Sequence, residues 1–148
     1  MSIEYITTCD NCKTPFAYET GLAYILFINN KLGRKIVSEI GNKQYRQELT
    51  EYLKTDKDFT SPIEKKLYGC QKCNVVYNVE VLENFKPDFP FMCAKCKIPL
   101  QELEMDIEDK NNVSYIKFTT PDKKNFKARC TECNKELSGI VDKTICVD

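Results

Sequence analysis

Stretches of apolar residues, and stretches in which apolar and polar residues alternate, predict β-strands in several parts of the chain. Residues 17–30 (AYETGLAYILFINN) predict an extended segment that ends in a turn-forming Asn-Asn pair. Residues 111–130 predict a β-hairpin, because Ile116 and Phe118 alternate with Tyr115, Lys117 and Thr119 and the sequence PDKKN suits a turn. A final strand is expected within residues 140–147, which are rich in Ile and Val.

A helical segment is predicted between these β regions. From residue 34 to residue 54, apolar side chains recur at intervals close to those of a helix, at Ile36, Ile40, Tyr45, Leu49 and Leu53. We expect this segment to pack on the preceding strand, with a partner-facing helix as the alternative. Residues 55–69 predict a loop and a short helix, whereas the acidic and polar residues 101–112 predict a connector. The predicted fold class is a small α+β protein with an inserted helical segment.

The cysteines carry the clearest chemical signal. Eight of the nine form four CxxC units, at Cys9/Cys12, Cys70/Cys73, Cys93/Cys96 and Cys130/Cys133. A CxxC turn directs two thiolates at one point, and two such turns make the tetrahedral sulfur cage that zinc prefers. Redox-active dithiols and buried structural cysteines are the alternatives. The spacing predicts two structural Zn²⁺ sites, with iron as the less favoured metal.

Two pairings of the four units are possible. In the nested pairing, Cys70 and Cys73 meet Cys93 and Cys96 across 19 intervening residues, which suffice for one hairpin. The other two units then form an outer site from Cys9, Cys12, Cys130 and Cys133. The sequential pairing instead joins the first unit to the second and the third to the fourth. The short loop favours nesting, as do the flanks: an aromatic residue follows the first two units at the fourth place and a leucine follows the last two.

The nested pairing divides the chain into modules. Residues 1–30 and 113–148 form an outer zinc-ribbon module, and residues 67–104 form an inner zinc ribbon. Residues 31–66 are the helical insertion, and residues 105–112 connect the inner ribbon to the outer module.

The sequences YGCQKCNVVYNVEV and FMCAKCKIPLQELE, within residues 67–104, resemble the two halves of a zinc ribbon. Such ribbons occur in transcription and translation proteins, and the nearest resemblance is to the ribbon in the large subunit of general transcription factor IIE. The similarity covers roughly a quarter of the chain and has the specificity of a superfamily. It implies a β-hairpin fold around zinc and a place in nucleic-acid machinery.

The amino-acid composition excludes several kinds of catalytic and metal site. The 148 residues include 22 basic and 22 acidic side chains and no histidine. Without histidine there is no Ser-His or Cys-His nucleophile and no mixed Cys/His metal site. The longest apolar stretch, residues 21–28, is too short to cross a bilayer, and the N-terminus does not resemble a secretory signal. We expect a reducing, intracellular compartment, cytoplasm or nucleus, with no membrane partner and no small-molecule substrate.

These observations predict a non-enzymatic accessory component of transcription or RNA-associated machinery. The densest basic cluster, on the hairpin within residues 111–130, could hold a phosphate backbone and stack a base. Its members are Lys123, Lys124, Phe126, Lys127 and Arg129. A solvated hairpin tip with no ligand is the simpler and favoured interpretation of the same residues.

Three other functions remain open. A zinc-stabilised adaptor, subunit or inhibitor would bind a larger protein with little nucleic-acid contact, and the zero net charge favours it. An electron carrier would hold iron in one of the cages. An enzyme would need an active site away from the metals, for which no constellation of residues is evident. The ninth cysteine, Cys146, is predicted to be a small buried apolar residue.

Overall fold

The computed structural model describes residues 2–27, 47, 59–82 and 90–147. Every named element in this part of the chain is a β-strand. The strands are β1 (Ser2–Thr8), β2 (Pro15–Phe27), β3 (Phe59–Gly69), β4 (Val76–Leu82), β5 (Gln101–Lys110), β6 (Val113–Thr119), β7 (Asn125–Phe126) and β8 (Val141–Val147). The described residues hold no helix of the length and apolarity that crossing a membrane requires.

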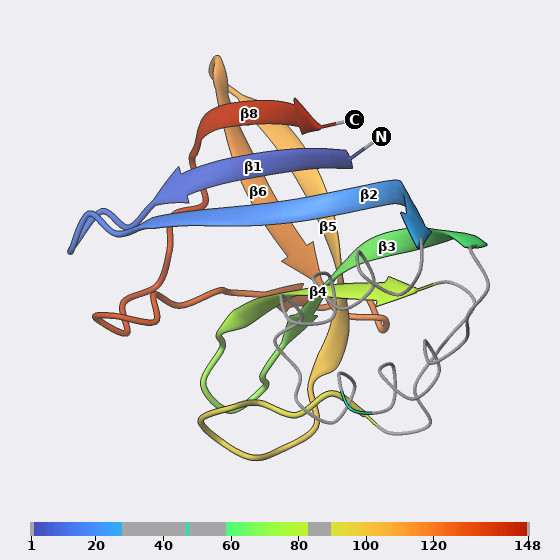
Figure 1. The fold of residues 1–148 in the computed structure, drawn as a ribbon. Helices are drawn as coiled ribbons and strands as arrows, with labels where there is room; N and C mark the ends of the chain where they lie inside the picture. Colours follow the sequence, from blue (N-terminus) through green and yellow to red (C-terminus); the bar gives the residue numbers. More distant parts are fainter. Residues whose placement is uncertain (1, 28–46, 48–58, 83–89, 148) are drawn as a thin grey trace.

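The strands form one antiparallel sheet in the order β7-β6-β5-β3-β2-β1-β8, with β4 paired to β3 (Figure 1). The sheet curls until its β8 end reaches β6. There the Ile116 N–H donates to the Gly139 carbonyl at 2.7 Å, and Tyr115 forms a bridge with Ile140. The first and last strands, β1 and β8, also pair along their lengths, so the two ends of the chain lie side by side.

The curled sheet encloses the apolar core. Its buried side chains come from strands on both halves of the sheet and from the segment between β7 and β8: Tyr18, Leu67, Leu103, Ile116, Phe118, Phe126, Ala128 and Leu137. The rings of Tyr18 and Phe118 meet edge to face, with centroids 5.1 Å apart. β3 passes so close to this core that a Cβ at Gly69 would lie 2.6 Å from the Phe126 ring. The packing of this cluster positions Gly69, which precedes Cys70. It therefore helps to fix the start of the Cys70–Cys73 turn, one of the four CxxC turns that we call knuckles.

The prediction of an α+β fold is wrong for the described residues. Residues 59–69, expected as a loop and short helix, form β3, which pairs with β2, β4 and β5. Local turn signals such as Pro62 were overridden by pairing with three strands. The predicted helix over residues 34–54 lies outside the described residues, apart from the single position 47.

The expected connector is also a strand. In β5, Leu103, Met105 and Ile107 alternate with acidic residues, and the strand pairs with β6 along Glu104–Lys110. Asn111 and Asn112 close this hairpin with φ of 54° and 64°, as a two-residue turn with positive φ at both positions requires. Strands from the predicted outer module and inner ribbon share one sheet, and the division into modules stays a prediction.

Candidate metal centres

The four CxxC turns share one backbone geometry. In each, the amide of the first cysteine donates to the carbonyl five residues later, at 2.8 to 3.1 Å. The amide of the residue after the second cysteine donates back to the first cysteine's carbonyl, at 2.8 to 3.0 Å. These residues have positive φ: Lys13 (63°), Asn74 (59°), Lys97 (59°) and Asn134 (62°). Asparagine adopts this conformation readily, whereas lysine does so at a cost, so the knuckle geometry holds the lysines there.

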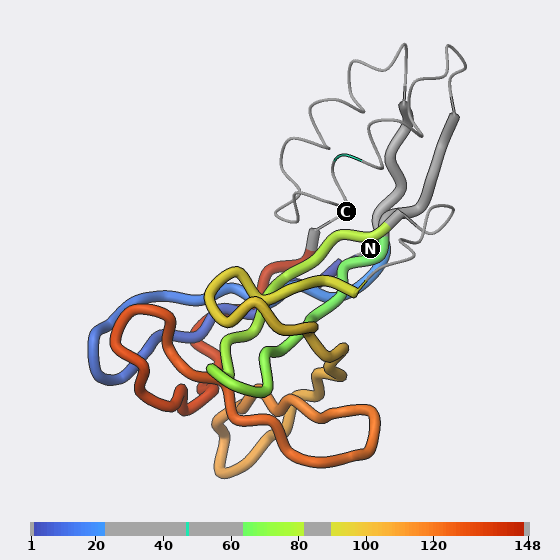
Figure 2. Tube along the Cα trace, turned by 90° about the horizontal axis from the view of Figure 1, so that it is seen from below, coloured from blue at the N-terminus to red at the C-terminus, as the bar shows by residue number. Residues whose placement is uncertain are grey.

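The structure groups the cysteines in the nested arrangement. Four Sγ atoms of the outer set lie within 4.8 Å of one another, those of Cys9, Cys12, Cys130 and Cys133. The inner set, Cys70, Cys73, Cys93 and Cys96, meets the same limit. Figure 1 shows the inner loops, green and yellow, together at the bottom of the view. In Figure 2 the blue N-terminal loop lies beside the red-orange C-terminal loop.

The sulfur spacing fits a tetrahedral metal ion. A Zn–S bond near 2.3 Å places the sulfurs of a regular tetrahedron about 3.8 Å apart. The Sγ···Sγ distances are 3.6 Å for Cys9–Cys133, 3.5 Å for Cys12–Cys130 and 3.8 Å for Cys73–Cys93. All nine cysteines are free thiols, and these separations far exceed a disulfide bond. Each four-cysteine group can therefore hold one metal ion, as a zinc-ribbon-like site does.

Burial makes each cage asymmetric. The first cysteine of every knuckle is buried, with Cys9, Cys70, Cys93 and Cys130 at most 1% exposed. The second cysteines are half-buried, except Cys12, which is exposed. The outer cage consequently has a more open face than the inner cage.

The thiols of the inner cage differ in acidity. Burial raises the pKa of Cys93, but hydrogen bonds from the Tyr77 hydroxyl and from the Cys96 and Lys95 amides outweigh burial and lower it to about 6. Burial raises the pKa of Cys73 to about 12. The Cys93 thiolate is thus favoured while Cys73, which burial keeps from ionising, holds a proton. A divalent cation bound to the sulfurs would stabilise both thiolates.

The outer cage shows the same contrast. Hydrogen bonds from the Asn11 side chain and the Lys135 amide lower the pKa of Cys133 to about 6, whereas burial raises that of Cys130 to about 11. At its exposed edge the Cys12 thiol lies 3.1 Å from the Thr14 hydroxyl, a contact that lowers the Cys12 pKa. Both cages therefore combine a ready thiolate with thiols that a metal ion must deprotonate.

Two asparagines tie the inner ribbon to the outer cage. The Asn74 carbonyl accepts from the Arg129 N–H at 2.9 Å, and its side-chain amide donates to the Lys127 carbonyl at 3.0 Å. The Asn78 side chain accepts from the Glu19 N–H at 3.0 Å and donates to the Ala17 carbonyl at 2.7 Å. The first asparagine thus holds the segment leading into Cys130, and the second holds the strand that follows Cys12. No pattern in the sequence indicated this role.

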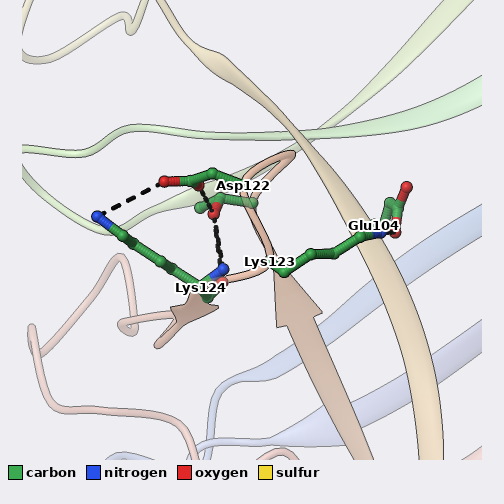
Figure 3. Close-up of polar contacts among 5 residues, drawn as sticks. Glu104, Asp122, Lys123 and Lys124 are labelled. Atoms are coloured by element: carbon green, nitrogen blue, oxygen red, sulfur yellow. Dashed lines mark hydrogen bonds and ion pairs between the residues drawn. The ribbon is translucent and has the colours of Figure 1, made fainter.

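The predicted nucleic-acid residues do not gather into a free basic surface. Lys123 lies 3.0 Å from Glu104 and Lys124 lies 3.5 Å from Asp122 (Figure 3). Lys127 lies 3.9 Å from Glu136, and the Arg129 guanidinium donates to the Asn134 carbonyl at 3.0 Å. Phe126 is only 8% exposed and packs in the core, where it cannot stack a base. The nucleic-acid role therefore stays a prediction that rests on the sequence.

The ninth cysteine is placed differently from the prediction. Cys146 lies on β8 and is exposed, not buried.

No family model, curated protein or solved structure matches the chain. The two cysteine clusters are compatible with zinc-ribbon-like sites, and they suggest a zinc-binding protein.

Proposed function

We propose that the chain is a non-enzymatic adaptor or subunit, in which two structural zinc ions fix a β-sheet scaffold that binds another protein. The observation that carries this proposal is the pair of four-thiol cages, each built from two knuckles of one geometry. The side-chain hydrogen bonds of Asn74 and Asn78, which we call braces, connect the inner ribbon to the segments that flank the outer cage. A small scaffold of this kind presents side chains at fixed positions without a large core.

The ligand set supports a structural role for the metal. Four thiolates fill the tetrahedral positions of zinc and leave none for water or substrate, so Lewis-acid catalysis is disfavoured. Zinc is favoured over iron because closed sites with four cysteines are typical of structural zinc, although rubredoxin-like iron uses the same ligands. Metal analysis separates zinc from iron. Visible absorption does so as well, since iron in such a cage absorbs visible light and zinc does not.

Charge and burial support a protein partner over nucleic acid. The interleaved aromatic ring of the predicted basic cluster is buried, so it cannot stack a base. Each of the three lysines has a carboxylate within 3.0 to 3.9 Å that offsets its charge toward a phosphate backbone. The chain as a whole has no formal net charge, so no long-range field draws a polyanion to it.

The test has two arms. Metal analysis of the purified protein should give two zinc ions per chain, and one or none would contradict the structural assignment. Affinity capture from the native host, followed by mass spectrometry, should retain a defined protein at near-equal amounts after nuclease treatment. Loss of all co-purifying proteins after nuclease would favour the nucleic-acid alternative.

A further inference from the structure

Strand β5 has a partner on only part of one edge. It pairs with β3 only through Gln101–Leu103, whereas it pairs with β6 along Glu104–Lys110. Beyond Leu103 the edge opposite β6 has no strand partner among the described residues. Figure 1 shows β5 continuing past β3 toward the top of the view. Alternate residues of this edge direct their N–H and C=O groups away from β6, where an added strand could pair with them.

A groove marks the place where the two strands separate. It has a volume of about 320 Å³ and lies between Glu64–Leu67 of β3 and Glu102–Asp106 of β5. Its lining includes four carboxylates, those of Glu64, Glu102, Glu104 and Asp106. The two lysines in the lining are already engaged, Lys65 with Glu19 and Lys66 with Glu102. The groove therefore presents excess negative charge beside an unpaired strand edge.

The side chains of β5 alternate in a way that specifies a partner. Glu102, Glu104, Asp106 and Glu108 are exposed on one face, whereas Leu103 is buried and Met105 and Ile107 are half-buried on the other. A strand added beside β5 would place its own side chains next to these in alternation. Basic residues would meet the carboxylates, and apolar residues would extend the contacts of Met105 and Ile107.

The carboxylates are free to change partners. Glu104 and Glu108 pair with Lys123 and Lys117 at 3.0 and 3.2 Å, and these four side chains are 40 to 73% exposed. Exposed pairs of this kind contribute little, so a ligand can replace them. Asp106 lies opposite Lys117 in the β5–β6 register yet forms no ion pair with any described residue.

We propose that the edge of β5 from Glu104 to Lys110 binds an extended segment of another protein by β-strand addition, and that basic and apolar residues alternate in this segment. This proposal rests on the proposed function as a protein-binding module and names the surface and the chemistry of the partner. Main-chain hydrogen bonds supply affinity, and the exposed carboxylates of Glu104, Asp106 and Glu108 supply specificity. A nucleic acid does not fit, because its phosphates would meet carboxylates.

The first test uses a synthetic probe, Lys-Val-Lys-Val-Lys-Val-Lys, with the full zinc-loaded chain. NMR titration should show shifts confined to β5 and its neighbours, and slowed amide exchange on the outward edge of Glu104–Lys110. A matched peptide, N-methylated at every peptide bond, keeps every charge but has no backbone N–H donor on either edge for strand pairing. Equal binding of both peptides would overturn strand addition and leave only nonspecific attraction.

The second test uses charge reversal. The double variant E104K/D106K should weaken probe binding by roughly tenfold or more, since like charges directly opposite each other in a sheet repel. The control is D142K, which reverses an exposed charge on β8 and should bind the probe as the natural chain does. Unchanged binding by E104K/D106K would exclude the β5 edge.

The same variants separate this inference from the proposed function. If E104K/D106K still captures the defined host protein, the adaptor function stands and the β5 edge is not its binding site. If no host protein is captured although the probe protects the β5 amides, the adaptor function fails while the edge-binding inference holds.

Discussion

The two cages share one ligand geometry but differ in the sequence separation of the cysteines that they join. The inner cage joins knuckles that are close in sequence, with Cys73 and Cys93 separated by 20 positions. The outer cage joins the two ends of the chain, since Cys12 and Cys130 are separated by 118 positions. Closing the longer loop costs about 1.5 kcal/mol more chain entropy. The same chemistry therefore forms a local hairpin clamp in one place and fastens the whole sheet in the other.

This difference implies an order of assembly. The inner cage needs only β3, β4 and the CxxC turn of Cys93 and Cys96, whereas the outer cage needs β1, β2 and the segment before β8 to be in place. Once the inner ribbon forms, Asn74 and Asn78 hold both flanks of the outer cage. We infer that the inner cage loads first and that its folding lowers the cost of closing the outer cage.

Removal of both metals should have the largest effect. Structural zinc can contribute about 10–16 kcal/mol in small zinc-dependent peptides, and the apolar core here is small. Treatment with a strong chelator should abolish the cooperative unfolding transition seen by calorimetry, and zinc should restore it. A sharp transition that survives complete metal removal would show that the sheet does not depend on the cages.

Removing one cage at a time breaks the symmetry between them. The variant C9S/C130S should keep one zinc per chain and a folded inner ribbon, because the inner cage forms locally. The variant C70S/C93S should lose most of both metals, because the outer cage then lacks its braces. Metal analysis with NMR of the retained strands provides the measurement. Equal retention of one zinc by both variants would show that the cages load independently.

Replacing an asparagine brace sharpens the comparison. Asn78→Ala removes two hydrogen bonds to the β2 backbone and should destabilise the fold by roughly 1–3 kcal/mol. The loss should appear as weaker binding of the second zinc in a competition titration, with the first zinc little changed. The control is Asn112→Ala, which alters the β5–β6 turn but touches neither cage. A uniform loss at both zinc sites would argue against a brace specific to the outer cage.

The smallest effect is expected from Tyr77→Phe, which removes the hydroxyl 3.3 Å from the Cys93 sulfur but keeps the ring. Because that hydrogen bond helps to lower the pKa of Cys93 to about 6, its loss should raise this pKa. The stability that the lowered pKa confers is full above pH 9 and is lost as the pH falls through about 6. In the variant, acid should therefore release the inner zinc at a higher pH, and the outer zinc should leave with it or after it, because the outer cage depends on the hydrogen bonds of Asn74 and Asn78. An identical release midpoint would remove Tyr77 from the inner site.

The cysteine grouping could be anticipated from sequence because metal ligation imposes local spacing and few pairings are possible. The strands were harder to predict from the sequence. β3 carries turn signals at Ser61 and Pro62, and only pairing with three other strands fixes its conformation. In β5 the acidic residues suggested a solvated connector, although the alternation of Leu103, Met105 and Ile107 was the signal that mattered.

The roles of individual side chains were harder to predict from the sequence than the strands were. Phe126 lies among lysines in sequence, but β7 is short and turns its ring into the core. The braces of Asn74 and Asn78 depend on segments distant in sequence, so no local pattern could reveal them.

The two cages also change the electrical character of the molecule. The formal charge of zero counts every thiol as neutral. Each tetrathiolate brings four negative charges and each zinc ion returns two, so the doubly loaded protein carries a net charge of about −4. Metal uptake thus converts a neutral chain into an acidic protein, which should migrate faster toward the anode in native electrophoresis than its metal-free form. Such a protein repels polyanions and attracts cationic chains before any contact is made.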